Sequence, residues 1–235
     1  MTHETAESYS LVNSDFKATP MRLLDAAGPI FAEKGLREAT VREICDQAGV
    51  NVAAIHYHFG DMEQLYVATV RRARGLREAR HPIPKWDPSQ SAEVRLHVFI
   101  KTILQRMLDP HAPWQVRLLM REILQPTEAC RALVEDYFRP EFEQLLSIVK
   151  ELLPERTTAL ECRRIAFSVM GQCVVYRLAD SVIREILPPG EYQSDFQITD
   201  LARHIATFSL TACGNWPPAT GSDSPESSKG LSDTS

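Results

Sequence analysis

The chain has 235 residues, of which 44% are hydrophobic and 24% charged, and its formal net charge is −5. No stretch reaches the roughly 18 apolar residues that would span a bilayer, which argues against an integral membrane protein. Aromatic residues are few (8%) and runs of Val, Ile and Thr are nearly absent, so the composition favours helices over strands. The sequence therefore predicts an all-α fold.

The cysteines are widely scattered and form neither a Cys-x-x-Cys motif nor a cluster with histidines. They are Cys45, Cys130, Cys162, Cys173 and Cys213. We therefore expect reduced thiols in apolar surroundings, with no metal site and no cofactor. The polar residues 1–17 lack the apolar core of a signal peptide, so we expect a cytoplasmic protein that does not contact a membrane.

The first predicted helix follows a polar segment. Residues 1–18 are expected to be a disordered leader. Thr19 would be the N-cap and Pro20 the first helical residue, and the helix would end at Gly35. Its apolar face, at the three-and-four spacing of an amphipathic helix, consists of Leu23, Leu24, Ala27, Ile30 and Phe31.

Two short helices come next. Thr40 and Glu43 form a predicted capping box at the start of the second helix, and Gly49 would end it in a left-handed conformation. Asn51 would then cap a third helix over residues 52–59, after a very tight connection. This arrangement predicts a helix-turn-helix.

The rest of the chain is predicted to be helical with a single clear interruption. A fourth helix would begin after Asp61, and three prolines in residues 81–88 exclude a helix there. We therefore expect a DNA-binding domain at 19–80 and a larger domain at 89–213, with a disordered tail at 214–235. Further helical patterns cover 89–108, 114–124, 127–153, 157–187 and 198–213.

The second helix of a helix-turn-helix enters the major groove of double-stranded DNA, so it must be short and present a small face. Histidine and tyrosine side chains add hydrogen-bonding groups at the groove edge. The residues of this helix expected to face DNA are Val52, Ala53, Ala54, His56, Tyr57 and His58.

The run from Thr40 to Phe59, followed by Gly60-Asp-Met-Glu-Gln-Leu65, resembles the DNA-binding signature of the TetR family of transcriptional regulators. The resemblance implies phosphate contacts from Thr40, Tyr57 and His58. It also places Val52, Ala53, Ala54 and His56 against base edges. Because Ala and Val contact only thymine methyl groups and groove shape, His56 is the candidate for a polar base contact.

One position departs from that family. Met62 stands where members usually carry Lys, so a phosphate contact is expected to be lost. Residues 19–80 hold nine basic and eight acidic residues, a net charge of only +1. Nonspecific attraction to DNA is therefore expected to be modest, and recognition must depend on geometry.

The second half of the chain is similar to the CecR-type ligand-binding domain, on the stretches 118–127, 138–142 and 172–176. The resemblance implies control of multidrug transport or a related membrane function. Candidate ligand-binding residues are Met107, Trp114, Arg121, Phe142, Gln172 and Tyr176. Each of these side chains could equally fill the core or hold the bundle together.

The stretch 165–186 is apolar on almost every face, which predicts burial on all sides. In a chain of this size, one side would face its own core and another a second subunit. The TetR-family resemblance also implies a dimer built from the last two helices. The predicted interface residues are Val169, Gly171, Val174, Val175, Leu178, Val182, Leu201, Ile205 and Phe208.

Two other features have ordinary interpretations. His56 and His58 are two residues apart and point to different helix faces, so they do not predict a metal site. A run of arginines is expected mainly to form a solvated face, although it could lie near DNA or stabilise the end of its helix. The run is Arg71, Arg72, Arg74, Arg77 and Arg80.

These features together predict an all-α homodimer that represses transcription. Its recognition helices would reach successive major grooves about 34–36 Å apart on a palindromic operator. A small-molecule inducer would favour a dimer whose DNA-binding domains are wrongly spaced for the operator. The repressor would then leave the DNA, and the controlled gene, often one for a transporter, would be transcribed. A ligand-independent regulator or an activator remains the alternative. An enzyme is disfavoured because the sequence has no nucleophile elbow, phosphate loop or zinc motif.

Overall fold

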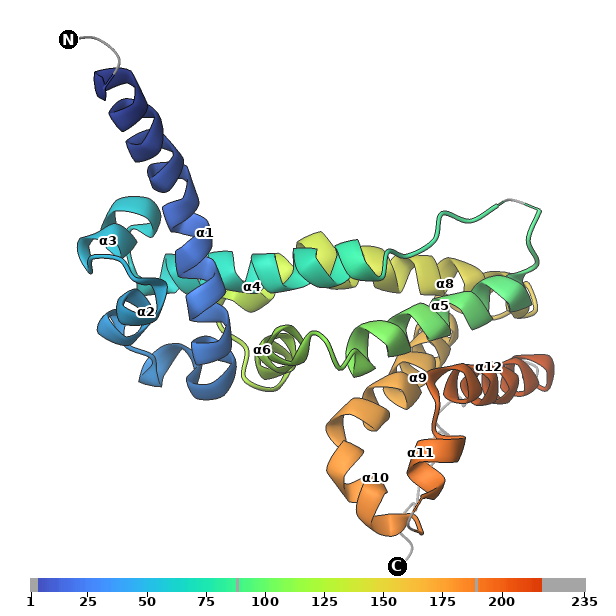
Figure 1. Ribbon diagram of the computed structural model, residues 1–235. Helices are drawn as coiled ribbons and strands as arrows, with labels where there is room; N and C mark the ends of the chain where they lie inside the picture. Colours follow the sequence, from blue (N-terminus) through green and yellow to red (C-terminus); the bar gives the residue numbers. More distant parts are fainter. Residues whose placement is uncertain (1–3, 88, 189, 217–235) are drawn as a thin grey trace, which may run out of the picture.

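The computed structural model describes residues 4–87, 89–188 and 190–216, and every regular element in these ranges is a helix, as predicted. In Figure 1, α1, α2 and α3 gather at one end, and the long helix α4 runs from them to the middle of the molecule. We call α1–α3 and the first half of α4 the head, and the remaining helices the body. The elements are α1 (Glu4–Glu38), α2 (Val41–Ala48), α3 (Ala53–Phe59), α4 (Met62–Arg80), α5 (Ala92–Leu108), α6 (Pro113–Leu124), α7 (Glu128–Leu133), the π-helical turn η1 (Val134–Phe138), α8 (Arg139–Leu152), α9 (Ala159–Leu178), α10 (Asp180–Ile186), α11 (Glu191–Asp195) and α12 (Ile198–Gly214).

The first helix differs from the prediction. It begins at Glu4, so residues 4–18 are helical where a disordered leader was expected, and Thr19 is not the N-cap. Pro20 lies inside the helix, although an interior proline removes one hydrogen bond and its ring crowds the carbonyl four residues earlier. The residues before it include the strong helix formers Glu, Ala, Leu and Lys. Gly35, with φ 75°, interrupts the helix where its end was predicted.

The body helices follow the predicted ranges with three differences. The stretch 127–153 passes through η1, and the stretch 157–187 is divided at Ala179, whose φ of −103° and ψ of 15° are not helical. The short helix α11 was not predicted. Residues 81–87 contain no helix, as their prolines require. The predicted tail lies almost entirely outside the described residues, which end at Trp216.

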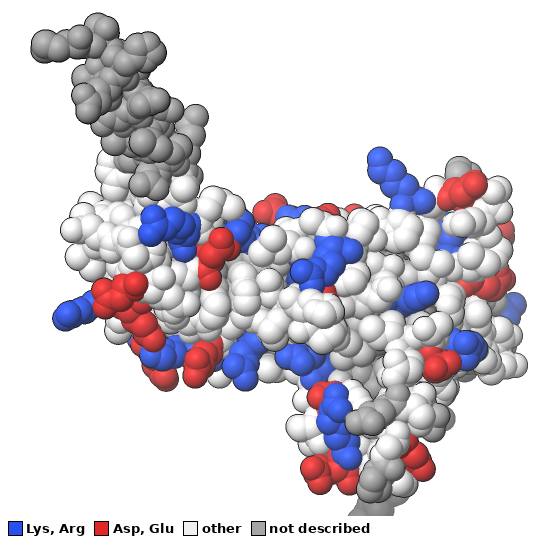
Figure 2. Space-filling view, viewed as in Figure 1, with Lys and Arg blue, Asp and Glu red and all other residues white. Residues whose placement is uncertain are grey.

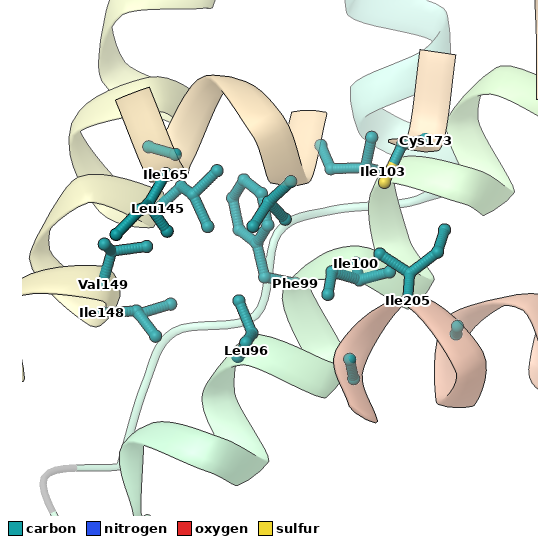
Figure 3. Close-up of a cluster of buried hydrophobic side chains, with 14 of the residues drawn as sticks. Leu96, Phe99, Ile100, Ile103, Leu145, Ile148, Val149, Ile165, Cys173 and Ile205 are labelled. Carbon is teal, nitrogen blue, oxygen red and sulfur yellow. The ribbon is translucent and has the colours of Figure 1, made fainter. Parts of the chain in front are cut away.

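Two clusters of buried apolar side chains hold the fold together. One lies between α5, α8, α9 and α12, and Figure 3 shows Phe99 and Ile100 of α5 pointing toward the side chains of the other three helices. The second belongs to the head, where Phe31 and Tyr66 meet edge to face with ring centroids 4.9 Å apart. Leu118 of α6 is completely buried in this second cluster. The core of the head is thus completed by a helix from beyond the proline-rich segment.

Candidate DNA-binding surface and ligand cavity

The turn between α2 and α3 is fixed by its backbone and by α1. Gly49 adopts φ 63° and ψ 42°, the left-handed conformation predicted for it. Arg22 of α1 donates hydrogen bonds from Nη2 to the carbonyl oxygens of Ala48 (2.7 Å) and Gly49 (3.0 Å). A Cβ at position 49 would lie 2.9 Å from that nitrogen. The first helix therefore holds the end of α2 and sets the angle at which α3 leaves the turn.

The caps of the two short helices match the prediction only in part: Thr40 caps α2, but the N-cap position of α3 is Val52 and not Asn51. The Thr40 hydroxyl accepts a hydrogen bond from the Glu43 amide (3.2 Å), but the Glu43 carboxylate pairs with Lys34 Nζ at 2.6 Å instead of completing a capping box. The ammonium group offers that carboxylate a stronger, charge-assisted bond than a backbone amide would. Asn51 Oδ1 accepts from the Ala53 amide at 2.9 Å, and α3 begins at Ala53, one residue later than predicted.

The recognition helix has one buried side and one exposed side. Ile55 is 3% exposed and anchors α3 to the head core, whereas Val52 is 51% and Tyr57 70% exposed. The other residues predicted to face DNA are also at the surface: Thr40, Ala53 and His56 are exposed, and Ala54 and His58 are half-buried. All seven are therefore placed where a DNA groove could reach them. Whether they contact DNA stays a prediction.

His56 has one ring nitrogen engaged within the head. Its Nδ1 lies 2.7 Å from the carbonyl oxygen of Gly60. Because a carbonyl only accepts hydrogen bonds, Nδ1 must carry the proton, which leaves Nε2 as the atom for an external partner. The rings of Tyr57 and His58 pack edge to face with centroids 5.0 Å apart.

The arginine run on α4 is not simply a solvated face. Arg72 pairs with Asp25 of α1 at 2.5 Å, and Arg80 pairs with Asp109 at 3.2 Å. Arg77 is 4% exposed and lies in the body, which corrects the expectation of a surface position. Acidic and basic side chains are interspersed over the face shown in Figure 2, in keeping with the near-neutral charge counted for the head.

A cavity of about 540 Å³ lies in the body beside the second half of α4. Its wall is formed by α4, α5, α6, η1, α8 and α9, and most of its lining is apolar. The larger apolar side chains are Met107, Met120, Phe138, Phe142, Phe167 and Met170. Its volume falls within the roughly 300–1,000 Å³ of typical small-molecule sites.

A buried polar cluster lies in this apolar wall. Arg106, 2% exposed, pairs with Glu141 and also reaches the Tyr137 hydroxyl at 3.3 Å. Arg77 donates from Nε and Nη2 to the Arg106 carbonyl oxygen, at 3.1 and 2.9 Å. Burial lowers the pKa of Arg77, raises the pKa of Tyr137 to about 12, and raises the pKa of Glu141 despite the nearby arginines. The phenol therefore stays neutral at physiological pH.

The predicted ligand residues are only partly brought together. Met107 and Phe142 line the cavity, but four others lie outside it. Arg121 donates to the Lys34 carbonyl oxygen at 3.1 Å and Gln172 to Ser209 Oγ at 3.4 Å, while Trp114 packs on the head core and Tyr176 beside Phe196. The alternative that these side chains hold the bundle together describes their contacts better.

Sequence reasoning missed the polar cluster of the cavity. Arg77 belongs to a run of five arginines that predicted mainly a solvated face. Tyr137 and Glu141 lie on a stretch with an ordinary amphipathic pattern, which does not distinguish them from other residues. Arg106 carried the one available signal, a charged residue between Leu104 and Met107 on a mostly apolar helix.

Family models match both parts of the chain. The model described as bacterial regulatory proteins of the tetR family matches residues 23–69. The model of the C-terminal domain of the HTH-type transcriptional dual regulator CecR matches residues 92–213, more than half of the chain. The protein belongs to the TetR family.

Relatives and solved structures agree with this assignment. The chain is 27% identical over 199 residues to the HTH-type transcriptional dual regulator CecR of Shigella flexneri, covering 79% of this chain and 86% of CecR. A TetR-like regulator from Rhodococcus sp. RHA1 has a TM-score of 0.60 at 19% identity, over 84% of this chain and 97% of that one. FadR of Bacillus subtilis, solved with stearoyl-CoA, has a TM-score of 0.57 at 16% identity, over 81% and 97%. TetR-family proteins are DNA-binding transcriptional regulators and not enzymes.

The residues predicted for the TetR-family dimer fall into two groups. Val169, Leu201 and Ile205 are 2%, 6% and 0% exposed, because they point into the protomer's own core; this corrects their assignment to an interface. Val174 is half-buried and lines the cavity. The other predicted residues are at the surface: Gly171, Val175, Leu178, Val182 and Phe208.

Two kinds of feature are absent from the residues of this TetR-family chain that the structure describes. They contain no group of three or more His, Cys, Asp or Glu side chains that could hold a metal ion. None of the helices built from them is long and apolar enough to cross a membrane.

Proposed function

We propose that the protein is a homodimeric repressor that a small-molecule ligand releases from a palindromic operator. The observation that carries this proposal is the position of the cavity along α4. Met62, at the start of this helix, follows the recognition helix, and Arg77, near its end, lines the cavity. A ligand that favoured one position of α4 would therefore also favour one position of the head. FadR, with the same fold, was solved with an organic ligand bound, which supports a ligand for this chain.

The exposed apolar face of α9, α10 and α12 supports the dimer. Val175, Leu178, Val182 and Phe208 are 47%, 50%, 56% and 61% exposed. Large apolar side chains grouped in this way mark an interaction surface in a protein of ordinary composition. A second copy packed on the same helices would form an intermolecular four-helix arrangement and place two heads side by side.

On the operator, α3 would enter the major groove. Tyr57 and His58, with Thr40 from the start of α2, would contact phosphates. Val52, Ala53 and Ala54 would lie against base edges, and His56 would use Nε2 for a polar base contact. The similarity to CecR favours a transport or drug-efflux gene as the target.

The first experiment measures binding of the purified protein to the DNA upstream of its own gene, by fluorescence anisotropy across a salt series. We expect two protomers per site and weaker binding to a scrambled duplex of equal length. Tyr57→Ala and His56→Ala should each weaken operator binding about tenfold, the loss expected for one hydrogen bond to a charged or well-placed group. Lys150→Ala, which removes an exposed positive charge from α8, is the control and should bind like the wild type. Equal binding to scrambled DNA would contradict autoregulation.

The second experiment measures molar mass in solution by light scattering after size exclusion. Val182→Asp and Phe208→Asp should each give monomers, because a buried unpaired carboxylate is costly in an apolar interface. Val94→Asp is the matched control, since Val94 is 48% exposed and belongs to α5, which contributes none of the proposed interface residues. A wild-type protein that is monomeric at micromolar concentration would contradict the dimer.

A further inference from the structure

The wall of the cavity is strongly biased in charge, although the chain as a whole carries −5. Among the described lining residues, four are arginines and one is a glutamate: Arg77, Arg106, Arg139, Arg163 and Glu141. Arg139 already pairs with Glu135 at 2.9 Å on the surface, and Arg163 is exposed, so water solvates its charge. The two buried arginines, Arg77 and Arg106, differ in whether a carboxylate balances their charge.

Arg106 is balanced. Its guanidinium pairs with Glu141, reaches the Tyr137 hydroxyl and donates from Nε to the His81 carbonyl oxygen at 2.7 Å. The pair resembles other buried ion pairs, in which the partners offset each other's loss of hydration.

Arg77 is held differently. Both of its hydrogen bonds go to one acceptor, the carbonyl oxygen of Arg106, which carries only a partial charge. At 4% exposure it receives little compensation from water. Leaving such a charge without an anionic partner is strongly unfavourable. The carboxylate of Glu141 is already shared with Arg106, and protonation of Glu141, which its burial favours, would only make the cluster more positive.

Apart from these charged residues, the described wall of the cavity is apolar except for Tyr137. Met107, Phe142 and Met170 line it, and the rings of Phe142 and Phe167 stack with centroids 4.5 Å apart. A fully hydrated ion would gain nothing from these walls. A molecule that fits must therefore be mostly apolar and carry its polar group at the Arg77 end.

We propose that the ligand of this cavity is an apolar molecule with a single carboxylate, whose head group pairs with the Arg77 guanidinium. The planar fork of an arginine matches a carboxylate, and one negative charge balances the one buried arginine of the described lining that lacks a carboxylate partner of its own. A neutral ligand would leave Arg77 uncompensated, and a cation would be repelled by the cluster. The inference rests on the proposed role of the cavity as the ligand site and specifies the chemistry of that ligand.

The test compares three probes of equal chain length by isothermal titration calorimetry, below their micelle concentrations. They are decanoate, 1-decanol and decyltrimethylammonium. We expect decanoate to bind at least about tenfold more tightly than decanol, since a hydrogen-bonded charge pair is stronger than a neutral contact. The cation should bind most weakly.

Variants of Arg77 test whether this residue causes the preference for decanoate over decanol. Arg77→Gln should reduce the preference for decanoate over decanol to about threefold or less, with decanol binding unchanged. Arg77→Lys keeps the charge and should retain part of the preference for decanoate. This variant still tests the proposal if the glutamine variant does not fold. Arg71→Gln, at an exposed position of the same helix, should behave like the wild type.

The outcomes separate the two claims. Equal affinity for decanoate and decanol in the wild type overturns the anionic ligand but leaves the cavity as a small-molecule site. An undiminished preference in both Arg77 variants overturns the role of that residue. Failure of all three probes to bind a protein that still binds its operator overturns this inference together with the ligand part of the proposed function.

Discussion

Tyr66 of α4 donates a 2.5 Å hydrogen bond to Oε1 of Glu122 on α6, and both residues are almost completely buried. The second carboxylate oxygen of Glu122 accepts from the Thr127 hydroxyl at 2.9 Å, at the start of α7. One buried carboxylate thus joins the head helix α4 to two helices of the body. Because a buried carboxylate without hydrogen-bond donors is costly, this contact favours one relative position of the three helices.

Tyr66→Phe should lower the free energy of unfolding by about 1–3 kcal/mol, because it removes a donor from a buried carboxylate while keeping the ring. Urea denaturation followed by circular dichroism measures this change. Tyr176→Phe is the control: its ring lies beside Phe196, and Phe keeps that contact. A loss below 0.5 kcal/mol for Tyr66→Phe, on the order of a neutral surface change, would contradict the importance of the contact.

Two glycines should respond to alanine with opposite signs. Gly35 has φ +75°, and a Cβ there would lie 2.4 Å from Arg121 Nε, so Gly35→Ala should destabilise the protein by about 1–3 kcal/mol. Gly75 lies inside α4, and its added Cβ would meet no atom within 4 Å. Gly75→Ala should therefore stabilise the protein by about 0.5–1 kcal/mol through helix propensity. Thermal unfolding of both variants gives the comparison, and equal shifts would contradict it.

Met62→Lys should strengthen operator binding. Met62 is the first residue of α4 and half-buried against the head, where a lysine could extend its ammonium group toward a phosphate. The slope of log K against log salt should become steeper by about 0.9, the contribution of one released counterion. Anisotropy titrations at several salt concentrations measure it. An unchanged slope would mean that position 62 does not face the DNA backbone.

Asp109 should contribute to a loss of stability in acid. Burial alone would raise its pKa, but hydrogen bonds from the His111 amide (2.8 Å) and from His81, together with Arg80, lower the pKa below its ordinary value. A carboxylate with a lowered pKa stabilises the fold above its unfolded pKa of about 3.9, and this contribution is lost as the pH falls through the folded value.

Asp109→Asn removes this titration. The variant should be less stable than the wild type at pH 7, and its unfolding free energy should fall less steeply between about pH 4.5 and 2.5. Urea unfolding at several pH values tests both statements. Parallel curves for the two proteins would show that Asp109 does not contribute to the acid response.

The helix-turn-helix could be predicted because its signals are local. The side-chain hydrogen bonds that Thr40, Asn51 and Asp61 accept from nearby amides, and the left-handed Gly49, each act within a few residues of their own position. The same local logic failed at Thr19, where a plausible cap and proline lie in the middle of a longer helix. Local preference is only one contribution there, and the neighbouring residues outweigh it.

The cavity could not be predicted in the same way, because residues from six helical elements form it. Arg121 and Gln172 are polar residues on apolar stretches, as a ligand site would require, but their helical phase points them at Lys34 and Ser209 instead. The sequence pattern of residues 165–186 indicates that two faces of the helix are apolar. It does not indicate which residues belong to each face. Val169 faces inward and Val175 outward, and only the packing of α9 against α12 and α5 decides this.

The place of Leu118 in the core of the head has a consequence for how such regulators can recombine. A chimera joined at residues 81–87 would separate Phe31 and Tyr66 from the α6 side chains that complete their core. A grafted head would then meet a foreign α6 whose side-chain shapes do not match it. Exchange of DNA specificity between relatives should therefore succeed by substituting the exposed residues of α3, or by transferring the head together with α6 and α7.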